Sequence, residues 1–159
     1  MKPIFGVLTV AVLLPLLGAE NNPAAGTWKL NLEKSKFSSA PAPKGATLII
    51  DGQGDSVKTS FEEIEADDSR VGYGYTAALD GKDYPLTGSS RPALLRGAET
   101  VTLRPNGSHA YSGWFKKSGQ VVMSDMITVS KDAKTLKMIV NSVDAKDQRV
   151  TLMTVWDKQ

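Results

Sequence analysis

Few residues in this sequence could carry out acid–base or nucleophilic chemistry. The 159 residues include no cysteine and a single histidine, His109, whose side-chain type titrates closest to neutral pH. No nucleophile motif, phosphate-binding loop or metal-ligand cluster accompanies it, and a lone histidine is more typical of a solvated strand position. If the chain were an enzyme, its acid or base would come from His109, Asp125 or Tyr75. We expect no catalytic residue, no metal and no cofactor.

Charged side chains are grouped in only one place. Five carboxylates occur between Glu62 and Asp68, but the run lacks the regular spacing and the turn glycine of a calcium loop. It is better interpreted as a solvated hairpin tip. Lys116 and Lys117 follow Trp114 and Phe115 but form no basic stripe, so we expect no nucleic-acid partner.

The first residues have the pattern of a secretory signal peptide, which we assign to residues 1–19. Lys2 precedes an apolar run from Ile4 to Leu17, and the small pair Gly18-Ala19 follows. The run is shorter than the roughly 20 apolar residues of a membrane span, and Pro15 interrupts its end. The sequence therefore predicts an exported protein, periplasmic or secreted, with no membrane partner after cleavage.

The remaining residues, 20–159, suit a single domain. Of the 19 Lys and Arg residues only Lys2 lies in the signal, so 18 basic side chains face 17 acidic ones and the charge of the mature chain is near neutral. Without cysteine, hydrophobic burial and strand pairing must hold the fold together. The oligomeric state is left open by these observations.

Short segments rich in Val, Ile, Thr and aromatic residues alternate with Gly, Asn, Asp and Lys turns, which is typical of an antiparallel all-β domain. Several segments place apolar side chains on one face at a period of two, as Trp28, Leu30 and Leu32 do. The segment 121–130 is ambiguous, because Val122 and Met126 oppose Met123 and Ile127. The nine expected strands span 26–32, 46–51, 56–64, 71–79, 99–103, 109–116, 121–130, 135–142 and 149–156.

A sheet with this many hairpins leaves two free edges unless it closes. We therefore predict an antiparallel up-and-down β-barrel of about eight to ten strands. The region 32–44 ends in Pro41 and Pro43 and is expected to be a loop, with at most one helical turn over 33–37. A barrel of this size is just wide enough to be filled by side chains or to hold one small ligand.

The residues Gly26-Thr27-Trp28-Lys29-Leu30 resemble the opening strand of the calycin superfamily, which includes lipocalins and fatty-acid-binding proteins. The end of the chain, Val155 to Gln159, resembles the last strand of the fatty-acid-binding proteins. The segment 75–88 and the hairpin-rich half after it resemble small exported bacterial lipocalin-like proteins of unassigned activity. The resemblance implies a cavity for an apolar or amphipathic small molecule, with Trp28 packed at the closed end.

The sequence also departs from these families. Fatty-acid-binding proteins insert two helices after the first strand, where this chain has prolines, and they commonly hold a carboxylate with an Arg-x-Tyr pair, whereas Val150 and Thr151 follow Arg149. Lipocalins stack a late arginine on the first tryptophan and end in a helix. Arg149 is the candidate for that arginine, and Gly26, Trp28 and Arg149 form the expected structural signature.

Candidate ligand contacts are large inward-facing side chains, because pockets are mostly apolar and aromatic. The alternative is that these side chains simply fill the barrel. The segment 85–98 is a long link with two arginines, Arg91 and Arg96, and is either a binding loop that meets an anionic headgroup or an exposed mobile connection. The six candidate ligand contacts are Phe61, Tyr73, Tyr75, Tyr111, Phe115 and Met138.

Three functional classes follow from this interpretation, in descending order. A small-molecule carrier predicts a continuous internal cavity with an aromatic lining. A protein-interaction module, for example a barrel-type inhibitor of exported enzymes, predicts a filled interior and action through loops or through residues 20–25. An enzyme would need an acid or base placed inside the barrel.

Overall fold

The computed structural model describes residues 22–38, 41–144 and 146–159, and in these residues ten antiparallel strands form a single sheet. The predicted signal peptide, residues 1–19, lies outside the described residues. One 3-10 turn, η1 (Ala93–Leu95), accompanies the strands. The strands are β1 (Gly26–Lys36), β2 (Gly45–Gln53), β3 (Ser56–Ile64), β4 (Arg70–Ala78), β5 (Asp83–Pro85), β6 (Thr100–Pro105), β7 (Ala110–Lys117), β8 (Gln120–Val129), β9 (Thr135–Val143) and β10 (Arg149–Lys158).

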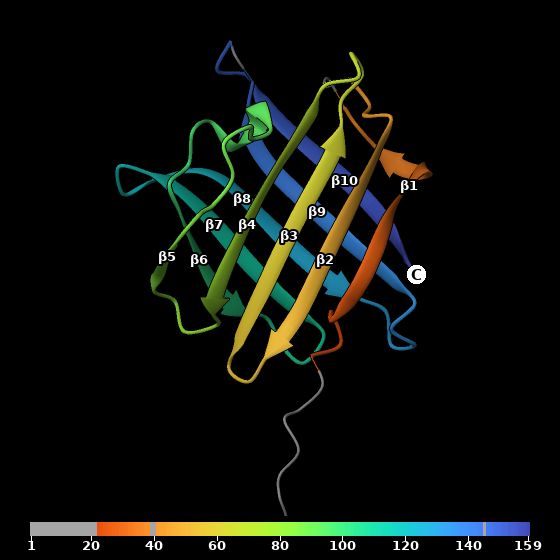
Figure 1. Cartoon of the computed structure of the whole chain (residues 1–159), viewed down its shortest axis with the longest axis vertical. Helices are drawn as coiled ribbons and strands as arrows, with labels where there is room; N and C mark the ends of the chain where they lie inside the picture. Colours follow the sequence, from red (N-terminus) through yellow and green to blue (C-terminus); the bar gives the residue numbers. More distant parts are fainter. Residues whose placement is uncertain (1–21, 39–40, 145) are drawn as a thin grey trace, which may run out of the picture.

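The sheet curls into a barrel in which β2, β3 and β4 cross in front of β7 to β10 (Figure 1). Its order is β4-β3-β2-β1-β10-β9-β8-β7-β6-β5, so successive strands are neighbours except β4 and β5, and the first strand pairs with the last. The predicted all-β, up-and-down barrel is confirmed. In the described part of the chain, no helix has the length and apolar character needed to cross a membrane.

The two edge strands, β4 and β5, are joined through the chain that follows β5. The Gly74 amide donates to the Thr87 carbonyl (3.2 Å), the Thr87 amide returns a bond to Gly74 (2.8 Å), and the Gly72 amide donates to Ser90 (2.7 Å). The approach is close: a Cβ on Gly88 would lie 2.7 Å from the Gly72 oxygen, and Gly88 has φ +105°. Glycines therefore permit the backbone contact that closes the barrel.

Trp28 seals one end of the barrel. Its side chain is fully buried, and its Nε1 donates to the Ala24 carbonyl at 2.8 Å. The cation over its ring is Lys158, with Nζ 5.3 Å from the ring centroid, and Gly26 leaves room for the Lys158 chain. Arg149 is exposed at the start of β10, opposite Val143, so the stacking cation on Trp28 is Lys158 and not Arg149.

The first strand is longer than the sequence suggested and changes partner along its length. It pairs with β2 only over Gly26 to Lys29 and then follows β10 as far as Lys36, with an irregularity after Asn31. The Ser35 hydroxyl bridges this irregularity, donating to the Asn31 carbonyl (2.6 Å) and accepting from the Val155 amide (2.9 Å). The helical turn expected over 33–37 was wrong, because hydrogen bonds to β10 keep this segment extended.

Two further differences from the expected strands have local causes. The short strand β5 was not predicted, because three residues ending in Pro85 carry no periodic signal. In β8 the ambiguity is settled by a register shift opposite Phe115 and Lys116. Beyond that shift Met123, Asp125 and Ile127 are buried, while Met126 is exposed.

The closing contact predicts a specific loss of stability for Gly88→Ala. The new Cβ would collide with the Gly72 carbonyl and would sit on a backbone at positive φ, whereas Gly107→Ala has positive φ but open space around its Cβ. We expect Gly88→Ala to lower the free energy of unfolding by about 1–3 kcal/mol more than Gly107→Ala, measured by urea denaturation. Equal losses would mean that the closing contact is not tight.

Candidate functional site

A cavity of about 550 Å³ opens at the end of the barrel opposite Trp28. The turns between β3 and β4 and between β9 and β10 surround its mouth together with η1 and the segment 41–43 (Figure 1). At this end β1 no longer pairs with β2, since their pairing stops at Lys29. Phe37, Pro41 and Pro43 line the cavity. Its volume is within the range of small-molecule sites.

Aromatic and aliphatic side chains make up the inner wall. Phe61 stacks on Tyr73, with ring centroids 5.2 Å apart, and meets Trp156 edge-on at 6.1 Å. Tyr73 also contacts Phe115 edge-on at 5.8 Å. These contacts hold the rings in fixed positions. The aliphatic part of the wall comes from Leu30, Met123, Met138, Val140, Val150 and Leu152.

The six side chains singled out in the sequence divide into two groups. Phe61, Tyr73 and Met138 line the cavity. Tyr75, Tyr111 and Phe115 are buried deeper and do not reach its wall. The structure thus brings all six to the interior, and their role as ligand contacts stays a prediction.

Asp125 is a buried carboxylate on the cavity wall. It is only 6% exposed, and its Oδ1 has no hydrogen-bond partner. Across the strand pair it faces Gly113, where a Cβ would lie 2.5 Å from Oδ1. Burial raises the pKa of Asp125 to about 7, a rise that the Gly113 backbone partly offsets. Near neutral pH this carboxyl group can therefore change its protonation state.

A second carboxylate on the wall, Glu63, lies near the mouth at the end of β3. It is half-buried, and burial together with the charge of Glu65 raises its pKa to about 7. The hydroxyl of Tyr73 is influenced by both carboxylates: burial raises its pKa well above the usual value, and the charges of Asp125 and Glu63 raise it further. Burial, with the charge of Asp125 adding to it, also raises the pKa of Tyr75. Tyr73 on the wall and Tyr75 behind it therefore stay neutral.

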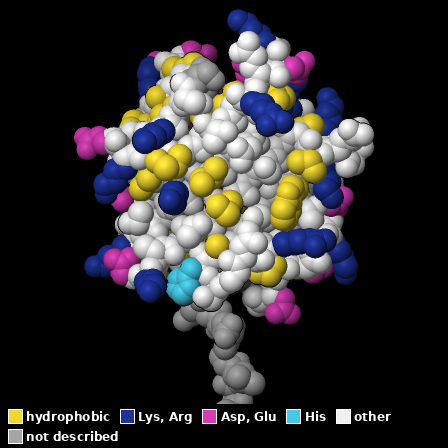
Figure 2. Space-filling model, turned by 180° about the vertical axis from the view of Figure 1, so that it is seen from behind, with side chains coloured by type: hydrophobic (Ala, Val, Ile, Leu, Met, Phe, Trp, Pro, Cys, Tyr) yellow, Lys and Arg dark blue, Asp and Glu magenta, His cyan; other side chains and the backbone are white. Residues whose placement is uncertain are grey.

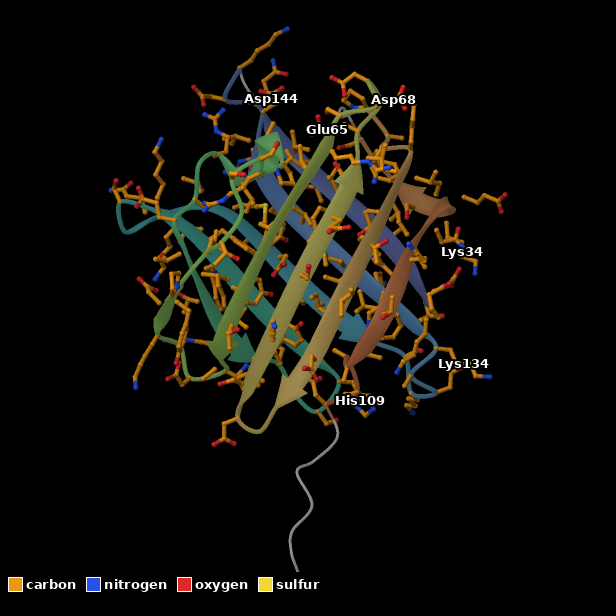
Figure 3. All side chains as sticks on the ribbon, viewed as in Figure 1. Lys34, Glu65, Asp68, His109, Lys134 and Asp144 are labelled. Carbon is orange, nitrogen blue, oxygen red and sulfur yellow. The ribbon has the colours of Figure 1, made fainter. Side chains whose placement is uncertain are left out.

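The mouth is ringed by polar turns. Figure 3 shows Glu65, Asp68 and Asp144 at this end of the molecule, whereas His109 and Lys134 lie at the other. Arg96 joins η1 to the β9–β10 turn, donating to the Asp144 carbonyl and to the Asp147 carboxylate, both at 3.0 Å. The His109 side chain is exposed, with its Nδ1 2.8 Å from the Ser108 hydroxyl, and it lies at the end of the barrel away from the cavity (Figure 3).

No group of three or more His, Asp and Glu side chains suited to a metal ion occurs within the described ranges. A second hollow, of about 620 Å³, lies along β1 to β4, and its lining mixes Lys29, Glu62 and Arg70 with the apolar Leu30, Ile64 and Val71. Such a lining is less suited to an apolar molecule than the wall of the first cavity.

Sequence reasoning missed several wall residues. Leu152 and Trp156 have inward-facing periodicity, but a period of two does not reveal which end of the barrel a residue occupies. Glu63 was taken as part of a solvated tip, although the alternation Thr59, Phe61, Glu63 already placed it on the inner face. Asp125, which alternates with Met123 and Ile127, was named only as the acid or base of a possible enzyme and not as a ligand contact.

Comparison with known proteins supports the architecture. No protein-family model matches the chain, and no curated protein matches it. Among solved structures, the zebrafish ileal bile acid-binding protein complexed with cholic acid is similar, with a TM-score of 0.53 and 10% sequence identity over 86% of this chain and 99% of that one. The fold is a calycin-like barrel. At this identity the similarity concerns the fold alone.

The raised pKa of Asp125 determines how the stability of the calycin-like barrel should change with pH. Because the folded pKa of Asp125 is raised, its contribution to stability is lost as pH rises from about 4 to about 7. Asp125→Asn should therefore gain stability relative to the wild type over this range, by on the order of 4 kcal/mol for a shift of about three pKa units. Urea unfolding of both proteins at pH 4, 5.5 and 8 tests this. A difference that stays constant with pH would contradict it, since the other carboxylates are common to both proteins.

Proposed function

We propose that this protein is an exported carrier that holds an apolar or amphipathic small molecule in the cavity of its calycin-like barrel. The observation that carries the proposal is the cavity itself: about 550 Å³, aromatic and aliphatic in its depth and open at one end. The zebrafish protein of similar fold was solved with cholic acid, an amphipathic small molecule. Export is inferred from the pattern of residues 1–19.

The alternative is a filled barrel that acts through its surface. A filled interior disagrees with a cavity of about 550 Å³. The surface also offers little support for a protein-interaction role. On the face seen in Figure 2, hydrophobic side chains are scattered in small groups among Lys, Arg and other polar side chains. The large exposed hydrophobic side chains, Leu32, Ile49, Val121 and Met126, come from β1, β2 and β8. We therefore place a protein-interaction role second.

Trp156 provides a local probe for occupancy of the cavity. It lines the wall, whereas Trp28 does not and Trp114 is partly exposed on β7. We expect 10-bromodecan-1-ol to quench tryptophan fluorescence through contact of its bromine with Trp156, and unbrominated decan-1-ol to compete with it. The saturable quenching should disappear in Trp156→Phe and persist in Trp114→Phe. Quenching that is equal in both variants would place the alcohol outside this cavity.

Export and cargo can be tested together by native mass spectrometry of protein purified from an exported fraction. We expect the mass of a polypeptide whose first residue is Glu20. We also expect an additional mass from a non-covalently bound molecule, which is lost on denaturation. A full-length mass would contradict export with cleavage at this site. A bare polypeptide would leave the quenching experiment to decide whether the barrel binds small molecules at all.

A further inference from the structure

The charge on the cavity wall has one dominant sign. Five carboxylates line the cavity, Glu63, Glu65, Asp67, Asp125 and Asp144, and Arg96 is the one basic side chain among the lining residues that the structure describes. A cavity lined in this way disfavours an anionic ligand. Clusters of carboxylates are common on protein surfaces. Whether each carboxylate can bind a ligand therefore depends on whether it already has a partner within the protein.

The charges at the mouth are already engaged within the protein. Glu65 accepts a hydrogen bond from the Ser69 hydroxyl (2.9 Å), and Asp67 accepts one from the Ser69 amide (2.9 Å). Asp144 caps its own turn by accepting from the amides of Lys146 (2.7 Å) and Gln148 (3.0 Å).

The guanidinium of Arg96 is engaged as well, by Asp144 and Asp147 of the β9–β10 turn. It is therefore not free to meet an anionic headgroup. This leaves Glu63, near the mouth, and Asp125, deeper in the wall, as the carboxylates that a ligand would meet.

Asp125 and Glu63 differ from Glu65, Asp67 and Asp144, which have partners within the protein. Asp125 is 6% exposed, lies on the wall, and has an oxygen without a partner. Glu63 has no hydrogen-bond or ion-pair partner within residues 22–38, 41–144 and 146–159. A buried polar atom without a partner costs free energy. A ligand that donates hydrogen bonds and carries a positive charge would recover that cost.

The surroundings of these carboxylates suit the same kind of ligand. Phe61, Tyr73 and Trp156 form an aromatic wall, and aromatic faces attract cations as well as apolar groups. The Asp125 Oδ1 lies in the space that Gly113 leaves, where a Cβ would come within 2.5 Å of it, so the glycine makes room for the carboxylate on the wall. Charge-assisted hydrogen bonds from an ammonium group to a carboxylate are among the strong ones.

We propose that the cavity selects a cationic amphiphile, an apolar body bearing a protonated amine, whose ammonium group is held by Asp125, with the charge of Glu63 nearer the mouth adding to the attraction. The proposal rests on the carrier function above and specifies the chemical class of its ligand. The apolar body packs on Phe61, Tyr73 and Trp156.

Binding of such a ligand is linked to pH. The groups facing Asp125 are the hydroxyls of Tyr73, Tyr75 and Tyr111, all of which stay neutral because burial raises each pKa. Asp125 and Glu63 both have pKa values raised to about 7, so below that pH each must lose a proton before it pairs with an ammonium. Affinity for the cation should therefore rise between pH 5.5 and pH 8, with proton release on binding.

The test uses three probes that share a ten-carbon chain: decylammonium, decan-1-ol and decanoate, titrated into the mature protein by isothermal calorimetry below their micellar concentrations. At pH 8 we expect decylammonium to bind one site at least about tenfold more tightly than decan-1-ol, and decanoate to bind most weakly. At pH 5.5 the advantage of decylammonium should shrink, whereas decan-1-ol should bind equally at both pH values.

Three variants locate the effect. Asp125→Asn should weaken decylammonium by about tenfold and Glu63→Gln by a smaller factor, and both should leave decan-1-ol within about twofold of the wild type. Asp55→Asn removes the same charge beyond the opposite end of β3, in an exposed turn, and should change neither probe. Unchanged decan-1-ol binding also shows that each variant is folded.

The outcomes separate this inference from the carrier function. If decan-1-ol or decanoate binds in the cavity as tightly as decylammonium, the charge selectivity is overturned and the carrier function stands. If the preference for decylammonium survives in both Asp125→Asn and Glu63→Gln, the assignment to these carboxylates is overturned. If none of the three probes binds, the carrier function and this inference fall together.

Discussion

The structure depends on a continuous ring of backbone hydrogen bonds. β1 pairs with β10, and the segment after β5 pairs with Gly72 and Gly74 of β4. The chain contains no cysteine, so no covalent link supports this ring. Unpaired edges would leave donors and acceptors exposed. Closure brings the large side chains of all the long strands into one interior, and the core, the cavity and the buried carboxylate all follow from it.

The two ends of the barrel differ because β1 behaves differently at each. Near Gly26 it pairs on both sides, and Trp28 fills the interior. Beyond Lys29 it stays with β10 and no longer pairs with β2. At that end the turns between strands surround the mouth of the cavity. An arrangement of this kind gives a rigid, plugged base and an entrance lined by turns, which differ most readily among barrels of the same topology.

The alternation of apolar residues was sufficient to predict the class of fold, nine strands and most of the inner face. It missed β5, which is too short to show a period, and the extension of β1, where hydrogen bonds through Ser35 and Asn31 outweigh local preference. The position of a residue along the barrel axis was not predictable either. Phe61 and Phe115 have similar local patterns, yet only Phe61 reaches the cavity, because that depends on how the strands are staggered and on which end remains open.

The Asp125 carboxylate occupies the space that a side chain at position 113 would need, since a Cβ there would fall 2.5 Å from the Asp125 oxygen. The two positions are therefore not free to vary independently. Among descendants of this sequence, a side chain larger than hydrogen at 113 becomes acceptable only after the acid at 125 has been replaced by something smaller or has turned away. Once position 113 carries a larger side chain, restoring the acid at position 125 also requires a return to glycine at position 113. In a related sequence, glycine at position 113 together with an acid at position 125 would therefore indicate that the internal carboxylate has been kept.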